Sequence, residues 1–178
     1  AAVAAIDRYV ADYAASKVKV EYDLLDAVTN VEDATKEGAP ILLDSLVGDH
    51  LGKKVKNTNV ASITRHEFGD PDKAFANAEN VVERTFTLQM VHQGYIEPHN
   101  ATAHWDEEDR IKVWTSTQGA FPVRTSTAAI LKLDVSRVKV TPLEIGGGFG
   151  GKIPVYLEPV VSILSRKSGR PVKAVMER

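Results

Sequence analysis

The sequence predicts an α+β fold in which short strands and helices follow one another along the chain. The first observation is the alternation of polar and apolar residues over several short runs, the longest being residues 81–91, because a period of two is typical of strands. The second is a set of helical stretches with stop signals, such as residues 155–168, which Gly169 and Pro171 follow. The third is a hydrophobic content of 43%, which supports an ordinary globular core.

The first 59 residues predict a strand, a helix and a second strand, followed by a linker. The three elements are expected at residues 3–6, 7–16 and 18–22. Asp7 suits the N-cap of the helix, because its carboxylate can accept a backbone N–H. Later signals are weaker: residues 31–37 predict a short helix, and the polar stretch 48–59 predicts a solvated connecting loop. We therefore expect a domain boundary between residues 59 and 60.

From residue 60 onward the sequence predicts strands and helices in alternation. Asp70, within the turn Gly69–Asp72, is the expected N-cap of a short helix. The acidic residues 106–109 invite a calcium site, but the spacing and glycine of an EF-hand are absent, so a solvated hairpin turn is favoured. The expected elements are a helix at 73–78, strands at 81–91, 101–105 and 111–114, a helix at 121–132, and strands at 137–140 and 172–176.

Composition and charge exclude several classes of function. The formal net charge is −2, which gives no basis for a nucleic-acid or anionic-membrane partner. The absence of cysteine excludes disulfides, thiol catalysis and cysteine-ligated iron–sulfur clusters within the chain. No apolar run approaches the roughly 18 residues of a membrane span. Because the sequence lacks an initiating Met and opens within a predicted strand, we expect it to be part of a longer protein.

Glycine is most concentrated in the stretch Gly146–Lys152, where five glycines surround Phe149. Glycine buries no side chain and costs backbone entropy on folding, so such a cluster indicates a sharp turn or the close approach of a ligand. The alternating run before it predicts a strand, and Pro154 suits the first turn of a helix after it. In a strand–loop–helix unit, several N–H groups can converge on an anionic or polar ligand at the helix N-terminus.

The residues alone leave three interpretations of this loop open. Gly146, Gly148 and Gly151 satisfy the G-x-G-x-x-G pattern of dinucleotide-binding loops, but a proline and a glutamate interrupt the strand before them. The G-x-x-x-x-G-K pattern of a phosphate-binding loop is also present, yet Ile153 stands where Ser or Thr would bind magnesium. The third interpretation is a tight structural turn without a ligand.

Three histidines and one carboxylate offer further chemistry. His92, His99 and His104 lie within 13 positions, but their spacings of seven and five lack the close pair that zinc sites usually have. Hydrogen-bonded histidines are therefore expected. Glu97, between His92 and His99, could act as a general base. No serine lies in a nucleophile elbow.

Four motifs occur in order along the chain: Tyr95–Pro98, Val113–Gln118, Ile145–Lys152 and Ser168–Val172. Together they resemble the large subunits of the molybdenum hydroxylases, which include xanthine dehydrogenases, aldehyde oxidases and carbon monoxide dehydrogenases. The resemblance extends over nearly all of the 178 residues. It implies that residues 1–59 are the C-terminal part of an α/β hammerhead domain plus a linker. Residues 60–178 would then be the N-terminal part, a mixed α/β segment, of a molybdopterin-binding domain.

The resemblance also implies a molybdenum–pterin cofactor in the full-length protein. The residues that it implies as cofactor-binding are Gly147, Gly148, Phe149 and Gly150. It implies no catalytic and no metal-ligating residue within this chain, since the glutamate base of the family belongs to a motif further downstream. Glu97 falls in a structural motif of the family, so that a hydrogen-bonding role is implied for it.

Two departures from the family pattern bear on the substrate. Ile153 stands where xanthine dehydrogenases have an acidic residue that contacts the purine. Val91 stands where a glutamine contacts the apical metal ligand, so either Gln93 substitutes or that contact is missing. The chain therefore resembles carbon monoxide dehydrogenase-like and aldehyde or heteroaromatic hydroxylases more than xanthine oxidisers.

We expect a cytoplasmic oxidoreductase in which this chain works with the remainder of the large subunit. Iron–sulfur and flavin subunits or domains would be its partners, and a small organic molecule or carbon monoxide its substrate. Alone, the chain is expected to be inactive and to bind no cofactor tightly, because it holds only one cofactor loop. The alternative is a non-catalytic protein-interaction module that uses the strands of residues 81–114 as an interface.

Overall fold

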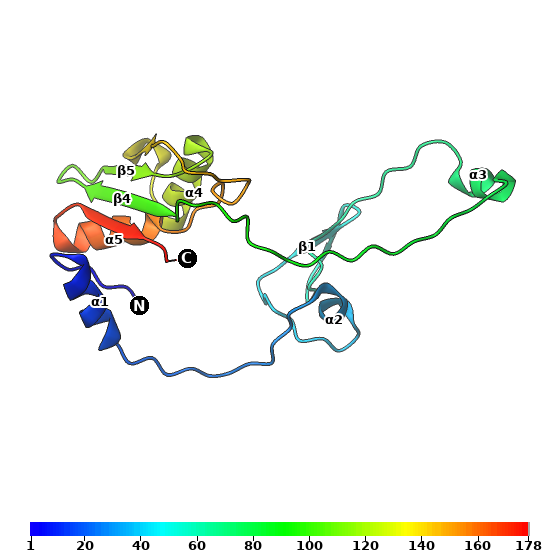
Figure 1. Cartoon of the computed structure of the whole chain (residues 1–178), viewed down its shortest axis with the longest axis horizontal. Coiled ribbons are helices and arrows are strands. Elements are labelled where there is room, and N and C mark those ends of the chain that lie inside the picture. The colour runs from blue at the N-terminus through cyan, green and yellow to red at the C-terminus, as the bar shows by residue number, and fades with distance from the viewer. Residues whose placement is uncertain (178) are drawn as a thin grey trace. The chain divides into compact units, whose positions relative to one another are not determined.

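The computed structural model describes residues 1–177, which form two compact units. The sheet unit combines Ala1–Val20 with the chain from Leu88 onward, and the hairpin unit consists of Glu21–Thr87 (Figure 1). Within residues 1–177, no helix is both long and apolar enough to cross a membrane.

The sheet unit is built on a four-stranded mixed sheet with the strand order β6-β5-β4-β7. Strands β4 (Asn100–Trp105) and β5 (Ile111–Thr115) form an antiparallel hairpin, as the sequence predicts. Strand β6 (Val138–Pro142) is parallel to β5, and β7 (Val172–Val175) is antiparallel to β4. Parallel neighbours need a crossover connection, and helix α4 (Ala120–Leu131) supplies it between β5 and β6.

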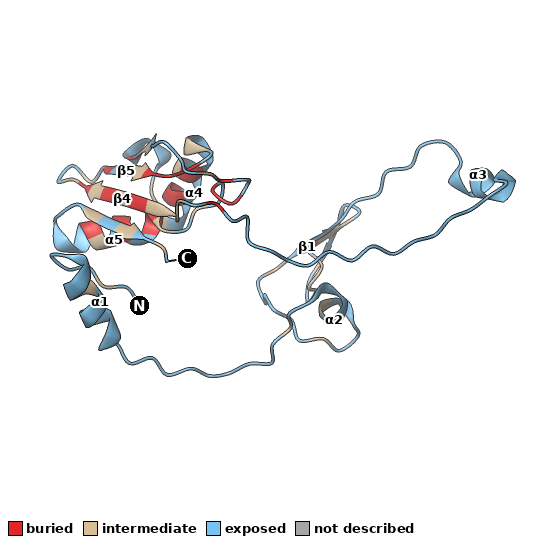
Figure 2. Ribbon diagram, in the orientation of Figure 1, coloured by how far each residue is buried: buried red, intermediate tan, exposed pale blue. Residues whose placement is uncertain are grey.

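Helices α4 and α5 (Glu158–Ser168) pack on one face of this sheet and bury the core (Figure 2). Buried and partly exposed residues alternate along β4, so every second side chain points toward the helices. The core consists of Ala101, Ala103, Trp105, Ile111, Val113, Ala128, Val138 and Val161. Thr115, the last residue of β5, is also buried, so the core reaches the start of residues 116–118, which contact the glycine loop.

Helix α1 (Arg8–Ser16) forms as predicted, and the Asp7 carboxylate caps it by accepting the Val10 N–H at 2.9 Å. The strands predicted on either side, residues 3–6 and 18–22, do not form. Alternation supplies an apolar face, but a strand also needs a neighbour to satisfy its backbone N–H and C=O groups. No segment in residues 1–177 pairs with either stretch, so both strand predictions are wrong.

The hairpin unit contains a three-stranded sheet of order β2-β1-β3. Strand β1 (Gly48–His50) is antiparallel to β2 (Lys53–Val55) and parallel to β3 (Ser62–Ile63). Leu51 and Gly52 form the turn with φ angles of 55° and 82°, the pair of positive values that a type I′ turn requires. The prediction of a solvated loop for residues 48–59 is therefore wrong. Polar composition alone does not indicate this hairpin, which depends on the positive φ angles of Leu51 and Gly52.

Two short helices of the hairpin unit are predicted correctly apart from their ends. Helix α2 (Val31–Thr35) is capped by Asn30. Helix α3 (Pro71–Asn77) is capped by Asp70, whose carboxylate accepts the Lys73 N–H at 3.0 Å. Differences of one or two residues at helix ends are usual, because terminal turns fray.

The run of residues 81–91, predicted as the longest strand, has no strand structure. Its apolar side chains are exposed, with 86% exposure for Phe86 and 94% for Met90. Alternation in the sequence defines the face that would be buried, but it does not supply a backbone partner. No segment of the described chain pairs with this run, so the strand prediction is wrong here.

Candidate functional site

The loop Gly146–Lys152, downstream of β6, takes positive φ angles at several positions. These angles are 91° at Gly147, 48° at Phe149 and 85° at Gly150, whereas Gly148 lies outside this region. Gly147 and Gly150 adopt these angles without steric cost because they have no Cβ. Alternation between positive φ and other conformations can turn successive N–H groups toward one concavity, the geometry of an anion-binding nest.

Crowding also requires glycine in this loop. A Cβ added to Gly148 would lie 2.5 Å from the Gln118 Oε1 atom. A Cβ added to Gly146 would lie 2.6 Å from the Glu97 Cβ atom. The backbone of the loop therefore rests directly on the side chains of Gln118 and Glu97.

Glu97 is hydrogen-bonded by four donors. Its Oε2 atom accepts from the Lys152 ammonium at 2.6 Å, from the Gly146 N–H at 2.7 Å and from the Ser116 hydroxyl at 2.7 Å. Its Oε1 atom accepts from the Asn100 amide at 2.9 Å. Burial alone would raise the pKa of Glu97, but these hydrogen bonds, led by that of Lys152, lower it from 4.5 to about 2. The geometry gives Glu97 the hydrogen-bonding role that the resemblance implies.

Lys152 closes the loop from within the protein. The residue is 1% exposed, and its ammonium lies 2.9 Å from the Ser116 hydroxyl and 4.9 Å from the centre of the Tyr95 ring. A lysine that binds phosphate must reach outward to its ligand. Because the Lys152 ammonium is held inward by Glu97, the phosphate-binding interpretation of the loop is wrong.

Gln118 holds the second half of the loop. Its Oε1 atom accepts the N–H groups of Gly150 at 3.0 Å and Lys152 at 3.2 Å. Its own N–H donates to the Lys152 carbonyl oxygen at 2.9 Å, and the Thr117 hydroxyl donates to the same oxygen at 3.0 Å. The sequence places Gln118 in the motif Val113–Gln118 but assigns it no role, since no nearby residue indicates that this motif contacts the glycine loop.

The helix after the loop begins later than predicted. Helix α5 begins at Glu158, with Pro159 rather than Pro154 in its first turn, so residues 153–157 separate it from the loop. The Glu158 carboxylate accepts the Tyr156 N–H at 3.0 Å and the Thr115 hydroxyl at 2.7 Å. The prediction that the loop leads straight into a helix N-terminus is therefore wrong. The dinucleotide-binding interpretation is wrong for the same reason, because the glycine motif of a dinucleotide-binding loop lies at the start of the following helix.

A chain of hydrogen bonds from two histidines supports the end of the loop. His99 Nε2 lies 2.9 Å from the Gly151 carbonyl oxygen and donates to it, because a carbonyl only accepts. In the neutral ring, His99 Nδ1 then accepts from the Tyr95 hydroxyl at 2.8 Å. His92 Nε2 lies 3.2 Å from that hydroxyl, and His92 Nδ1 accepts the Gly94 N–H at 3.0 Å. These rings also line a cavity of about 420 Å³.

The other residues singled out in the sequence lie as follows. His104 belongs to β4, and across residues 1–177 no three His, Cys, Asp or Glu side chains are grouped to hold a metal ion. Val91 is 79% exposed. The Gln93 side chain reaches the loop, since a Cβ added to Gly151 would lie 2.9 Å from it. The two alternatives were a substitution by Gln93 and a missing contact, and the proximity of Gln93 to the loop favours the substitution.

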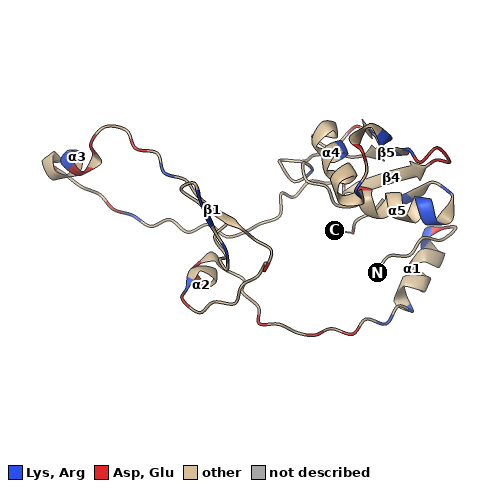
Figure 3. Ribbon diagram, turned by 180° about the vertical axis from the view of Figure 1, so that it is seen from behind, with Lys and Arg blue, Asp and Glu red and all other residues tan. Residues whose placement is uncertain are grey.

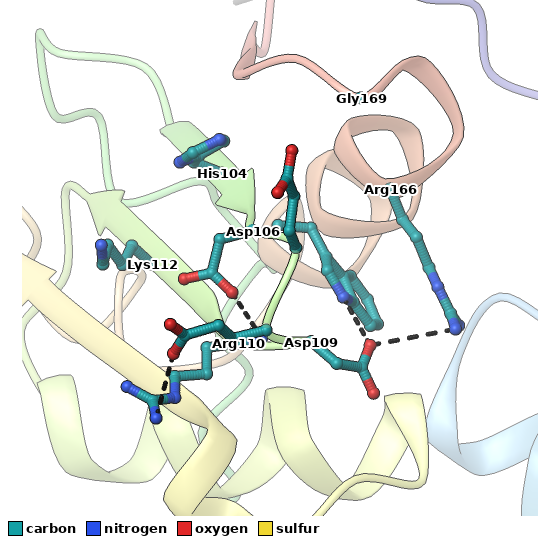
Figure 4. Close-up of a pocket in the computed structure, with 10 residues that line it drawn as sticks. His104, Asp106, Asp109, Arg110, Lys112, Arg166 and Gly169 are labelled. Atoms are coloured by element: carbon teal, nitrogen blue, oxygen red, sulfur yellow. Dashed lines mark hydrogen bonds and ion pairs between the residues drawn. The ribbon is translucent and has the colours of Figure 1, made fainter.

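A cavity of about 840 Å³ lies at the tip of the β4–β5 hairpin and not at the glycine loop (Figure 4). Acidic residues gather in this turn (Figure 3). Asp109 accepts from the Trp105 indole N–H at 2.7 Å and lies 3.9 Å from Arg166. Arg110 pairs with Glu108 at 3.1 Å. These charged side chains pair with one another or with Trp105, which agrees with the predicted solvated turn.

The chain matches the molybdopterin cofactor-binding domain family over residues 52–178. It is 30% identical over 178 residues to the nicotinate dehydrogenase large molybdopterin subunit of Eubacterium barkeri, covering 100% of this chain and 39% of that protein. It is 34% identical over 183 residues to the carbon monoxide dehydrogenase large chain of Hydrogenophaga pseudoflava, and the match covers 100% of this chain and 23% of that protein. The solved structure of the reconstituted CO dehydrogenase from Oligotropha carboxidovorans is similar, with a TM-score of 0.77 at 30% identity. The match covers 97% of this chain and 22% of that chain.

These similarities confirm the resemblance inferred from the ordered motifs, and the α+β fold class with it. The chain spans from about a fifth to two fifths of the length of these relatives. It is thus similar to large subunits of molybdenum hydroxylases, and it belongs to the molybdopterin cofactor-binding domain family.

Proposed function

We propose that this chain forms one wall of the cofactor site in the large subunit of a molybdenum hydroxylase. Gly148 is the observation that carries the proposal, because the residue is buried and its N–H has no hydrogen-bond partner within residues 1–177. Buried backbone N–H groups are almost always paired. An oxygen atom of the molybdenum–pterin group would satisfy this donor.

The neighbours of Gly148 extend the donor set. The N–H groups of Gly147 and Phe149 also lack a partner in the described part of the chain, and the Phe149 ring is 73% exposed. Gly150 differs, since its N–H already donates to Gln118. We assign Gly147, Gly148 and Phe149 as donors to the cofactor. Gly150 instead leaves room for the cofactor, because a Cβ added to it would meet no atom within 4 Å.

The residues of this chain bind and orient the cofactor. When bound, the molybdenum–pterin group supplies two-electron oxidation chemistry. Backbone N–H groups donating to negatively charged oxygen atoms form charge-assisted hydrogen bonds, which strengthen where water is excluded. We assign proton transfer to no residue here, because Glu97 already accepts from four donors.

The full-length protein would need partners that this chain lacks. The rest of the large subunit would close the site, since one loop makes few contacts with a large ligand. Iron–sulfur and flavin subunits or domains would take up electrons, because this chain has no cysteine to hold a cluster. We also propose a cytoplasmic location and keep the domain boundary between residues 59 and 60 as a proposal.

The relatives do not settle the substrate class, since they include a nicotinate dehydrogenase subunit and carbon monoxide dehydrogenases but also probable hypoxanthine oxidases and a probable xanthine dehydrogenase subunit. One residue bears on it directly. Ile153 is apolar and 49% exposed beside the loop, so it offers no carboxylate to a purine. We propose a small non-purine organic molecule or carbon monoxide.

Metal and pterin analysis tests the proposal. The full-length protein, purified from cells supplied with molybdate, should contain molybdenum and pterin in equal amounts. A protein that contains neither molybdenum nor pterin would contradict the proposed function. The loop would then be a structural turn without a ligand, or the chain an interaction module.

The variant Gly148→Ala tests the loop itself. Its Cβ would lie 2.5 Å from the Gln118 Oε1 atom, so the loop must shift and turn its N–H groups away. We expect molybdenum content to fall by about tenfold, on the scale of one or two lost charge-assisted hydrogen bonds. Gly119→Ala is the matched control, because its nearest neighbour would be 3.4 Å away. Equal metal contents in the two variants would count against the assignment.

A further inference from the structure

A single oxygen atom holds both ends of the glycine loop. Glu97 Oε2 accepts the N–H of Gly146 at 2.7 Å and the ammonium of Lys152 at 2.6 Å. These two residues are the first and last of the loop and lie 49 and 55 positions from Glu97. The Ser116 hydroxyl donates to the same atom, and the Glu97 N–H donates to the Gly146 carbonyl oxygen at 3.2 Å. We name Glu97, Ser116, Gly146 and Lys152 the Glu97 clasp.

The clasp requires a carboxylate. Three donors converge on Oε2, and a glutamine could turn its amide oxygen toward them but would bring no negative charge to the Lys152 ammonium. The Lys152 side chain is 0% exposed, so its charge must be balanced by direct contact with an opposite charge. Glutamine therefore cannot replace Glu97 without leaving a buried ammonium unpaired.

We propose that Glu97 is a positioning residue, which holds Gly146 and Lys152 together and thereby aims the N–H groups of the residues between them. Gly147, Gly148 and Phe149 lie within the span that the clasp closes. Glu97 acts on the ligand only through this backbone, because its two oxygens are occupied by donors from the protein. The inference rests on the proposed function for what the loop binds, whereas closure of the loop depends on no ligand.

The test uses the full-length protein with the double substitution Glu97→Gln/Lys152→Met. Removing both charges leaves no unpaired buried charge, so the fold should survive while the clasp is lost. The control is Glu144→Gln, which neutralises an exposed carboxylate two residues before the loop. All proteins are compared by thermal melting, and the melting temperature of the double variant should stay within about 5 °C of wild type.

Amide hydrogen exchange measures closure of the loop directly. Peptides that cover residues 146–151 should exchange about tenfold faster in the double variant, because local opening becomes easier. Peptides from β4 and β5 should keep their wild-type rates, since their ladder is unchanged. Wild-type exchange of the loop in the double variant would overturn the inference.

Cofactor retention and kinetics measure the aiming of the N–H groups. Molybdenum should be released about tenfold faster during gel filtration of the double variant. For whichever of benzaldehyde, nicotinate or carbon monoxide the wild type oxidises with a dye, kcat should fall roughly tenfold while KM changes little. Faster exchange combined with unchanged release and unchanged kcat would also overturn the inference.

Failure of the proposed function looks different. A wild-type protein without molybdenum refutes that function, while the exchange comparison still decides whether the clasp closes the loop. If the double variant does not fold, Ser116→Ala carries the test, because it keeps both charges and removes one donor from Glu97 Oε2. Loop exchange about threefold faster than wild type supports the clasp, and unchanged exchange overturns it.

Discussion

At the scale of single residues, Glu97 links the stability of the fold to pH. Its pKa is lowered from 4.5 to about 2, although burial alone would raise it, because protein donors bind its ionised form. The ionised carboxylate therefore stabilises the fold above about pH 4.5, and this contribution is lost as the pH falls toward 2. The whole shift corresponds to roughly 3 kcal/mol, and partial exposure of the carboxylate reduces this to about 2 kcal/mol.

We predict that the free energy of unfolding drops more steeply with acid in the wild-type chain than in Glu97→Gln/Lys152→Met. Urea unfolding between pH 7 and pH 2.5 should show an extra loss of about 2 kcal/mol in the wild type. The same acid dependence in both proteins would mean that Glu97 is not held in its ionised form.

A second prediction at this scale concerns Gln118. Gln118→Leu keeps the approximate size of the side chain but leaves the N–H groups of Gly150 and Lys152 without an acceptor. Lys152 is buried, and an unpaired buried N–H costs about 1–3 kcal/mol, so the variant should unfold at lower urea concentration and its loop should exchange faster. Gln118→Glu retains an acceptor and should recover most of the stability. Loss of equal size in both variants would argue against the hydrogen bonds as the cause.

At the scale of elements, the β5–α5 contact positions residues 116–118, which contact the glycine loop. The buried Thr115 hydroxyl lies 2.7 Å from the Glu158 carboxylate, which is itself 6% exposed, and 3.0 Å from the Asn100 carbonyl oxygen. Thr115→Val keeps the shape of the side chain and removes the donor. We predict a loss of about 2 kcal/mol in unfolding free energy, because a buried carboxylate loses a hydrogen bond. Thr102→Val, on the partly exposed face of β4, should cost less than about 0.5 kcal/mol.

Local signals identified the elements that depend on near neighbours. Asp7 and Asp70 cap helices α1 and α3, and Gly169 ends α5 in a left-handed conformation, as the sequence predicts. The β4–β5 hairpin also follows from alternation on both sides of a polar turn. By contrast, the apolar run 3–6 and the alternating run 81–91 have no partner strand in the described chain. A strand is a property of a pair of segments, so alternation alone overpredicts it.

At the scale of the whole molecule, we predict that residues 1–178 alone hold no cofactor and associate with themselves. One loop provides few contacts, and large apolar side chains such as Phe86 and Leu88 are 86% and 92% exposed. Gel filtration with light scattering should show species larger than the 19.4 kDa monomer, and metal analysis should find no molybdenum. A monomer loaded with metal would refute both expectations.

The sequence is sufficient to predict the family and the position of the glycine loop. Four ordered motifs pointed to the molybdopterin-binding proteins, which the match over residues 52–178 confirms. It also identified the glycine loop as the place where backbone comes close to something else.

The contacts that hold the loop come from segments distant in the sequence, so they follow from the fold. Glu97 lies 49 positions from Gly146, and Gln118 lies 32 positions from Gly150, yet each contacts the loop within hydrogen-bond distance. Lys152 resembled a phosphate-binding lysine in the sequence, and the fold turns it inward to Glu97. These interactions differ in range, because caps and turns are set by residues a few positions apart, whereas a buried charge is placed by whichever distant segment can neutralise it.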